Sequence, residues 1–321
     1  MKKRKIYTSI ACALLCASTL TACSNIDYTV PLTAYWYDHY ATTPSVVEET
    51  LVYKVTFEAS SSLAGQDWAV SYNEGTYTTH LTKENDTYVY RTELSISGTF
   101  SYGLENTHAF TDSVKTAVTF NDKSKAPIYS WKEIHSTSPV NAPTAESYFT
   151  ETHQTVETFY EADLSKGTCV TTDLTKAEPK PVTNTFEIDS KYTYVDNEQL
   201  LFALRGLNQK TSPSFYVYAP FSRKVQTVNA TFDALKTGDT FSFETVDDNK
   251  GKDTLRAIPF YPITLGIDEK NSGAAQTIWL AQLTDPSHNE YRNVILWMRV
   301  TLAYNVGTLN YSLQSANFID K

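Results

Sequence analysis

Few residues in this sequence have the type and spacing that enzymatic chemistry requires. The six histidines stand singly, at His39, His80, His108, His135, His153 and His288. The chain contains no His-Glu-x-x-His, no Gly-x-Ser-x-Gly, no glycine-rich phosphate loop and no paired-cysteine zinc spacing. Asp38 and His39 are adjacent, so on a strand they would point to opposite faces and would not share a site. We expect a non-enzymatic protein without cofactor or metal; a hydrolase with dispersed residues is the alternative.

The clearest motif lies at the N-terminus and ends at Cys23. A basic run, Lys2-Lys3-Arg4-Lys5, precedes an uncharged apolar run from Ile6 to Leu20. At about fifteen residues, the apolar run is shorter than the ~20 residues of a membrane span. It ends in Leu20-Thr21-Ala22-Cys23, which resembles the lipobox of bacterial lipoproteins. We interpret residues 1–22 as a signal peptide and the Cys23 thiol as the site of lipidation. The alternative is an ordinary secretory signal in which Cys23 is incidental.

The predicted lipid anchor sets the expected location of the protein. Each buried methylene contributes ~0.8 kcal/mol, so two or three palmitate-like chains hold a protein to a bilayer persistently. The resemblance therefore implies a cell-envelope lipoprotein, on the outer face of the cytoplasmic membrane or in an outer membrane. Residues 23–50 are expected to form a lipid-anchored tether. This tether is expected to pack partly on the body, because the stretch from Tyr35 to Tyr40 is unusually aromatic.

The other cysteines indicate that the mature chain has no internal disulfide. Cys12 and Cys16 lie in the predicted signal peptide, and Cys23 would carry lipid, so Cys169 has no partner. Cys169 follows a turn and opens a strand-like segment. We interpret it as a small apolar side chain on a strand; a catalytic thiol there would need a histidine-type base close by.

Charge and composition exclude one class of partner. The chain has a net charge of −9, and four of its positive charges lie in the predicted signal peptide. Such an acidic chain lacks the basic surface with which proteins displace counterions from nucleic acids. Apolar residues make up 41% and aromatic residues 13% of the chain, which is sufficient for a buried core.

From residue 51 onward the sequence favours strands. Leu51, Tyr53, Val55 and Phe57 alternate with polar residues, the period of a half-buried strand. Similar segments recur between short polar turns, which predicts an all-β, mostly antiparallel meander that curls into a barrel or half-barrel. One short helix is predicted near 197–206. The β-rich body, 51–321, is one unit or is divided near 176–181, where two prolines interrupt the pattern.

Three stretches resemble an uncharacterised family of exported bacterial proteins, a domain of unknown function. They are 196–205, an acidic cap on a short helix that ends in Leu-Arg; Ile278-Trp279-Leu280; and 307–313, similar to the closing strand of that family. The architecture is similar to that of the LolA and LprG carriers. This resemblance implies a curved antiparallel sheet that cups a lipid chain against a helical lid.

The candidate ligand-binding residues follow from this resemblance and from the apolar strands. The predicted lining residues are Leu201, Phe202, Trp279 and Trp297, and Arg205 is placed at the mouth. Arg205 is expected either to clamp an acidic head group or to complement the helix dipole or a loop carboxylate. The two tryptophans are expected to pack in a core or to line a cavity. The first functional hypothesis is a lipoprotein that binds a hydrophobic or amphipathic, lipid-like ligand. The alternative is an envelope interaction protein that binds glycan or protein through exposed aromatic residues, with unknown protein partners.

Two acidic segments are interpreted as structural. Asp247-x-Asn249-x-Gly251-x-Asp253 has alternating oxygen donors but lacks the distal glutamate of a calcium loop, so an ordinary hairpin turn is expected. Glu48-Glu49 is interpreted as surface charge.

Overall fold

The computed structural model describes Leu32 and residues 46–63, 66–103, 105–207, 212–237, 241–247, 251–267, 276–282, 291, 293–302 and 306–320. The predicted signal peptide, Cys23, Asp38-His39 and the stretch from Tyr35 to Tyr40 lie outside the described residues. No helix within the described residues is long and apolar enough to cross a membrane.

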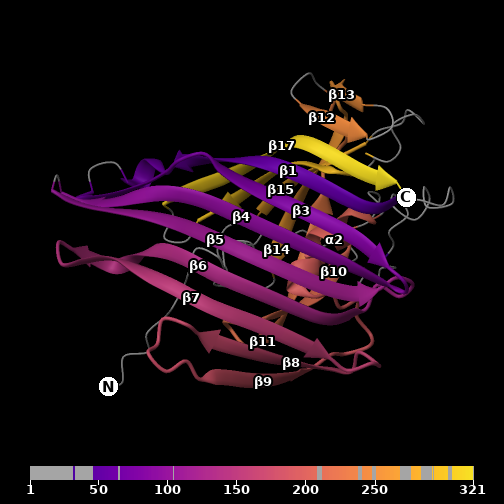
Figure 1. Ribbon diagram of the computed structural model, residues 1–321, viewed down its shortest axis with the longest axis horizontal. Coiled ribbons are helices and arrows are strands. Elements are labelled where there is room, and N and C mark those ends of the chain that lie inside the picture. The colour runs from indigo at the N-terminus through magenta and orange to yellow at the C-terminus, as the bar shows by residue number, and fades with distance from the viewer. Residues whose placement is uncertain are drawn as a thin grey trace.

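The N-terminal half is a meander of long antiparallel strands (Figure 1). From β3 to β9, each strand pairs with the next, while β1 pairs with β3 and the short β2 pairs with the far end of β4. The elements are β1 (Val46–Ala59), a 3-10 turn (Ser61–Leu63), β2 (Trp68–Tyr72), β3 (Gly75–Glu84), β4 (Thr87–Tyr102), β5 (Asn106–Asn121), β6 (Pro127–Thr144), β7 (Ser147–Tyr160), β8 (Lys166–Asp173) and β9 (Pro181–Glu187).

The C-terminal half extends the sheet from the other edge of β1. β17 pairs antiparallel with β1, and β16, β15, β14, β11 and β10 follow in that order. The β12–β13 hairpin joins β17 through a parallel pairing of β12. The strands are β10 (Ser214–Ala219), β11 (Lys224–Phe232), β12 (Ser242–Asp247), β13 (Gly251–Arg256), β14 (Phe260–Ile267), β15 (Gln276–Ala281), β16 (Ile295–Thr301) and β17 (Gly307–Asp320).

The sheet curls into a nearly closed barrel, and its two ends, β9 and β10, are joined without a regular ladder. The Tyr216 amide of β10 donates to the Thr193 carbonyl at 2.9 Å, and the Val195 amide donates to the Tyr216 carbonyl at 3.0 Å. The ring of Phe186 from β9 stacks on that of Tyr218 from β10, with centroids 3.9 Å apart. The predicted curled, antiparallel all-β fold is confirmed.

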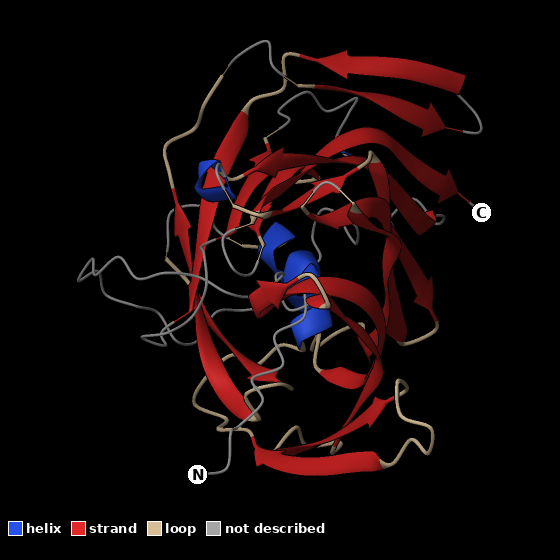
Figure 2. Ribbon diagram, turned by 90° about the vertical axis from the view of Figure 1, so that its left-hand side faces the viewer, coloured by secondary structure: helices blue, strands red, loops and turns tan. Residues whose placement is uncertain are grey.

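A short helix occupies the space inside the strands (Figure 2). A 3-10 turn (Asn197–Gln199) leads directly into α2 (Leu200–Arg205). Asp196 caps this turn, because its carboxylate accepts a hydrogen bond from the Glu198 amide at 2.7 Å. The predicted helix near 197–206 is confirmed, with Gly206 as its C-cap.

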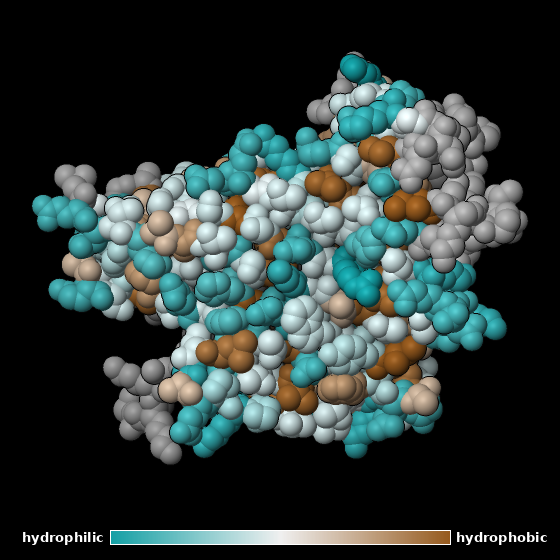
Figure 3. Space-filling view, in the orientation of Figure 1, coloured by the Kyte–Doolittle hydropathy of each residue, from teal (hydrophilic) through white to brown (hydrophobic). Residues whose placement is uncertain are grey.

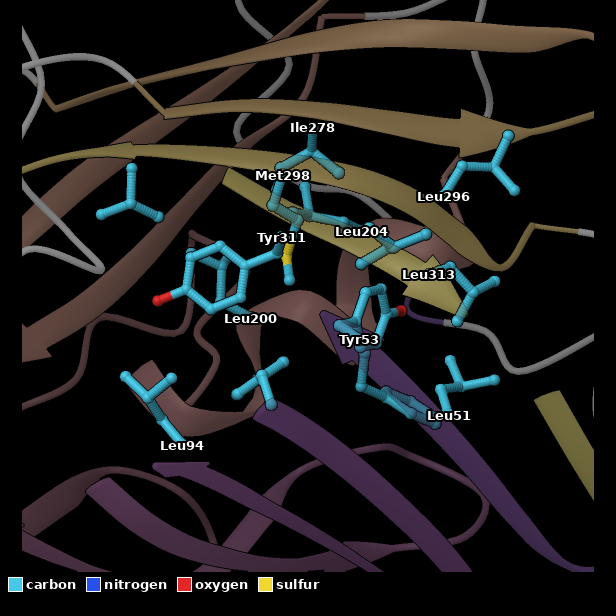
Figure 4. Close-up of a cluster of buried hydrophobic side chains, with 14 of the residues drawn as sticks. Leu51, Tyr53, Leu94, Leu200, Leu204, Ile278, Leu296, Met298, Tyr311 and Leu313 are labelled. Carbon is cyan, nitrogen blue, oxygen red and sulfur yellow. The ribbon is translucent and has the colours of Figure 1, made fainter. Parts of the chain in front are cut away.

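The interior is filled from both halves of the chain and from the helix. Alternate residues of each strand point inward, as on β5, where Phe110, Val114, Val118 and Phe120 are buried. Figure 4 shows the helix side chains meeting strand side chains from both halves. Its labelled members are Leu51, Tyr53, Leu94, Leu200, Leu204, Ile278, Leu296, Met298, Tyr311 and Leu313.

The outer face of the meander is mainly hydrophilic or neutral (Figure 3). Threonines and charged residues occupy the outward positions of these strands, as the period-2 pattern requires.

The expected start of the β-rich body at residue 51 and the expected division near 176–181 both lie within the continuous sheet. β1 begins at Val46, five residues before the position expected from the alternation. The proline-containing segment 176–181 connects β8 and β9, which pair with each other, so the sheet continues across it.

Candidate functional site

The sheet splits between β5 and β6. Their register runs from Phe120↔Pro127 to Ser113↔His135, and beyond that point each strand continues with its other neighbour only. β5 stays paired with β4 back to Asn106, while β6 stays paired with β7. The two strands therefore lose their mutual backbone hydrogen bonds beyond this point, although Ser136, Thr137 and Ser138 of β6 stay buried.

Asp112 lies at the point where the two strands separate. It occupies an inward position of β5, between Phe110 and Val114, and is 2% exposed. One carboxylate oxygen, Oδ1, accepts a hydrogen bond from the Thr137 amide of β6 at 2.7 Å. This bond replaces the ladder bond that is lost at the split. The other oxygen, Oδ2, is buried and has no hydrogen-bond partner among the described residues.

Burial dominates the electrostatics of Asp112. Desolvation raises the pKa of its carboxyl group from 3.8 to about 7, against the lowering effect of the hydrogen bonds from Thr137. The nearby charge of Glu151 raises the pKa further. A carboxyl group that titrates near neutral pH on the inner face of a barrel is typical of functional sites.

Three further buried polar atoms lie on neighbouring parts of the inner face: Tyr72 interacts electrostatically with Asp112, Ser136 is next to Thr137, and Gln154 pairs with Ile134 of β6. They are the hydroxyl of Tyr72 on β2, the hydroxyl of Ser136 on β6 and the amide nitrogen of Gln154 on β7. Like Asp112 Oδ2, they have no hydrogen-bond partner among the described residues. We call Tyr72, Asp112, Ser136 and Gln154 the polar cluster. A buried polar atom without a partner costs about 1–3 kcal/mol, so four of them indicate a site that another molecule completes.

A group of aromatic rings lies at the split and contacts the polar cluster through Tyr72. Phe100 and Phe110 lie on the inner faces of β4 and β5, with centroids 5.3 Å apart. Phe149 of β7 reaches across the split and stacks on His108 at 3.8 Å. The ring of Tyr72 meets Phe110 edge-on at 5.1 Å. We call Phe100, Phe110, Phe149 and His108 the aromatic wall.

Glycine allows β2 to reach this region. A Cβ at Gly98 would lie 2.4 Å from the Ser71 carbonyl oxygen of β2 and 2.5 Å from the Phe110 ring. The bare backbone of β4 therefore lets β2 pair with it and brings Tyr72 next to Phe110.

The structure corrects the expected position of Arg205. Its side chain is 1% exposed and lies in the interior, not at a mouth. Both terminal nitrogens donate to the Glu49 carboxylate, at 2.6 Å and 2.7 Å, and Nε donates to the Asn293 carbonyl at 2.9 Å. The interpretation of Glu49 as surface charge is wrong, because it occupies an inward position of β1 and its side chain is fully buried. The carboxylate partner of Arg205 is thus on a strand, not on a loop.

The other predicted lining residues do not share one site. Phe202 is 1% exposed and contacts Tyr88, Tyr90 and Phe120 in the core, while Leu201 is only partly buried against that core. Trp279 and Trp297 stand opposite each other on β15 and β16, with centroids 4.3 Å apart. Their neighbours in sequence point inward, so the tryptophans lie on the outer face rather than the concave one.

A second polar network fixes the start of the helix. The Asp196 carboxylate accepts hydrogen bonds from the hydroxyls of Ser130 at 2.6 Å and Tyr160 at 2.5 Å. Lys132 pairs with Glu198 at 2.9 Å. Burial raises the pKa of the Asp196 carboxyl group, and repulsion by the Glu198 charge raises this pKa further. Because these contacts satisfy Asp196, we assign the network to positioning the helix.

The described residues offer little support for covalent or metal chemistry. The Cys169 side chain is fully buried on β8, its sulfur lies 4.0 Å from the Thr171 hydroxyl, and burial raises the pKa of its thiol. A raised pKa disfavours the reactive thiolate. No group of three or more histidine, cysteine or acidic side chains suited to a metal ion occurs within the described part of the chain.

The polar cluster was not identified from the sequence, although a signal for it exists. Along β5, every inward position from Phe110 to Phe120 is apolar or threonine except Asp112. A carboxylate in the buried phase of an alternating strand is uncommon, and such a residue is a candidate for a binding role.

Comparisons with known proteins bear on the fold. No family model matches the chain, and no curated protein matches it. The chain is similar to the crystal structure of a β-barrel-like protein of domain of unknown function DUF1849 from Brucella abortus, with a TM-score of 0.51 and 10% sequence identity. The alignment covers 86% of this chain and 99% of that one. At this identity the likeness shows a shared β-barrel-like fold alone. The lipobox and the carrier resemblance stay predictions.

Proposed function

We propose that this protein is a cell-envelope lipoprotein that binds an amphipathic, lipid-like ligand on the inner face of the barrel at the β5–β6 split. The polar cluster would hold the head group of the ligand, and the aromatic wall would contact its apolar part. The observation that carries the proposal is the polar cluster itself: four buried polar groups on the inner faces of β2, β5, β6 and β7, each with an atom that lacks a hydrogen-bond partner among the described residues.

The chemistry of the split suits an amphipathic molecule better than a purely apolar one. Tyr72, Ser136 and Gln154 supply hydrogen-bond donors, and Asp112 supplies an acceptor or, when protonated, a donor. Phe100 and Phe149 offer apolar surface, whose burial stabilises a complex by roughly 25 cal/mol per Å². A few polar groups among apolar and aromatic side chains are the usual composition of a small-molecule site.

The proposed lipid anchor would place this binding site at a membrane surface. A lipidated Cys23 would keep the barrel within reach of a bilayer, which is the source of lipid-like ligands. Binding without chemical conversion is proposed because the sequence has no His-Glu-x-x-His or Gly-x-Ser-x-Gly motif and burial raises the pKa of the Cys169 thiol.

Native mass spectrometry tests the binding proposal. Residues 24–321 would be exported behind a cleavable secretory signal and purified gently from the periplasm of the expressing bacterium. The intact mass would be compared before and after organic extraction. We expect an extra mass that extraction removes. Ser136→Leu should lack this mass, because leucine fills the inner face at the polar cluster with an apolar group.

A matched variant separates loss of the site from loss of the fold. Ser95→Leu places the same side chain on the exposed, outer face of β4, where the ligand should be unaffected. A clean apo mass for the wild-type chain, with no uptake of added phospholipid or fatty acid, would disprove the proposal. So would an unchanged extra mass in Ser136→Leu.

A further inference from the structure

A groove opens on the outer face of the barrel, where β1 ends beside β16 and β17. Its cavity volume is about 530 Å³, which is within the usual range for ligand sites. The groove lies away from the polar cluster, because its strand residues point outward. Its lining residues are almost all polar or small: Glu58, Ala59, Ser60, Ser61, Arg299, Thr301, Gly307 and Thr308.

A charge-neutral pair stands in this groove. Arg299 Nη2 donates to Glu58 Oε2 at 2.9 Å, and both groups also contact the Thr308 hydroxyl, at 3.5 Å and 3.4 Å. Their side chains are 44% and 62% exposed. A guanidinium has five donors and a carboxylate has about four acceptor positions, more than these contacts use. The pair therefore presents both donors and acceptors to solvent without net charge.

Aromatic rings continue this surface along the sheet. Trp297 precedes Arg299 by two residues on β16, so both side chains project from the outer face, about 7 Å apart along the strand. Trp297 is half-buried and contacts Trp279, which stacks on Phe260 at 4.8 Å. The edge of an aromatic cluster thus borders a groove rich in hydroxyl groups.

We propose that this outer groove binds a neutral oligosaccharide. Sugar hydroxyl groups donate and accept at once, which matches the paired guanidinium and carboxylate of Arg299 and Glu58. The apolar C–H face of a sugar ring packs well on an indole such as Trp297. Because the pair carries no net charge, it gives an anionic or a cationic ligand no net Coulombic attraction. The inference is independent of the lipid-binding proposal, since the two sites share no residue.

Calorimetric titration of the purified body, residues 24–321, tests the groove. The probes are the tetramer of β-1,4-linked N-acetylglucosamine, cellohexaose, maltohexaose and, as an anionic comparison, oligogalacturonate. We expect at least one neutral probe to bind with one site per chain. Glu58→Gln, Arg299→Ala and Trp297→Ala should each weaken that binding at least tenfold.

Two variants on the outer face serve as matched controls. Arg91→Ala removes an exposed arginine of β4, and Trp131→Ala removes a half-buried tryptophan of β6, both outside the groove. These variants should bind the sugar like the wild type. The inference is overturned if no neutral probe binds at millimolar concentration, if oligogalacturonate binds more tightly, or if the groove variants bind as well as the wild type. None of the groove variants should alter an extractable mass seen by native mass spectrometry.

Discussion

At the level of single residues, the barrel interior holds two buried carboxylates in different electrostatic environments. Glu49 has a fully buried, bidentate guanidinium partner in Arg205. Asp112 has one backbone donor from Thr137 and an oxygen without a partner among the described residues. Burial of an unpaired charge is costly, whereas a paired charge recovers part of the cost. Glu49 therefore has its charge compensated within the fold, whereas Asp112 keeps hydrogen-bonding capacity that the described residues do not use.

The pKa of Asp112 predicts how stability depends on pH. The carboxyl pKa is about 7 in the folded chain, against 3.8 for an exposed group. Between those values the folded chain keeps a proton that the unfolded chain has released, so the free energy of unfolding falls as pH rises from about 4 to 7. The change in pKa from 3.8 to about 7 corresponds to a loss of roughly 4 kcal/mol in the free energy of unfolding. Asp112→Asn should remove the part of this fall that Asp112 contributes, leave the part due to Asp196, and still accept the Thr137 hydrogen bond.

Urea denaturation at several pH values measures this effect. Asp163→Asn, in an exposed turn, is the control and should leave the pH dependence between 4 and 7 in place. A wild-type stability that stays flat over this range would show that Asp112 is not buried as described.

The Arg205–Glu49 pair predicts a large penalty for removing one partner. Arg205→Met leaves an uncompensated buried carboxylate and should lower the free energy of unfolding by about 3–5 kcal/mol. The double variant Glu49→Leu/Arg205→Met should regain most of that loss, because both charges are removed. The exposed pair of Arg299 and Glu58 gives the comparison: Arg299→Met should cost less than about 1 kcal/mol. Equal losses in the two single variants would contradict the assigned burial.

At the level of elements, the short helix acts as an internal support rather than as a lid. Its side chains at Leu200, Phe202 and Leu204 are buried among strands of both halves of the sheet. The capping carboxylate of Asp196 ties its start to β6 and β7. Six residues of α-helix would not be stable alone, so tertiary contacts must hold it.

The orientation of the helix predicts that truncating Phe202 and truncating its neighbour Leu201 will lower the free energy of unfolding by different amounts. Phe202→Ala should destabilise the chain by about 3–5 kcal/mol, because it opens a cavity between Tyr88 and Phe120. Leu201→Ala, on the partly buried side, should cost clearly less. Thermal and urea unfolding of the two variants measure the difference, and a greater loss for Leu201→Ala would refute the orientation of the helix.

At the level of the whole molecule, one rolled sheet carries the two proposed binding sites on opposite faces. The inner face at the β5–β6 split combines the polar cluster with the aromatic wall. The outer face at β16 and β17 combines a neutral ion pair with the tryptophan pair. A single twisted sheet can present both, because successive residues of each strand point to opposite sides.

The predicted lipid anchor at Cys23 would determine whether the whole barrel is attached to a membrane. Cys23→Ser should prevent lipidation and move the protein from the membrane fraction to the soluble fraction of the expressing bacterium. Metabolic labelling with a palmitate analogue should mark the wild type and not the variant. Ser24→Ala is the control, because it leaves the thiol in place. Unchanged labelling in Cys23→Ser would reject the lipoprotein assignment.

The sequence alone determined the features that depend on local pattern. Alternation of apolar and polar residues, as from Leu51 to Phe57, predicted the antiparallel strands. The acidic cap and the leucine stripe predicted the helix near 197–206. These features were predictable because neighbouring residues in the chain create them.

Only the tertiary structure decided which side chains meet. Glu49 and Arg205 are 156 positions apart, and the register of β15 with β16 puts Trp297 beside Trp279. Asp112 became a candidate site because β5 and β6 separate at that residue, which leaves its second oxygen without a partner among the described residues. Register, strand separation and burial arise from contacts between distant segments, and a local sequence pattern does not encode them.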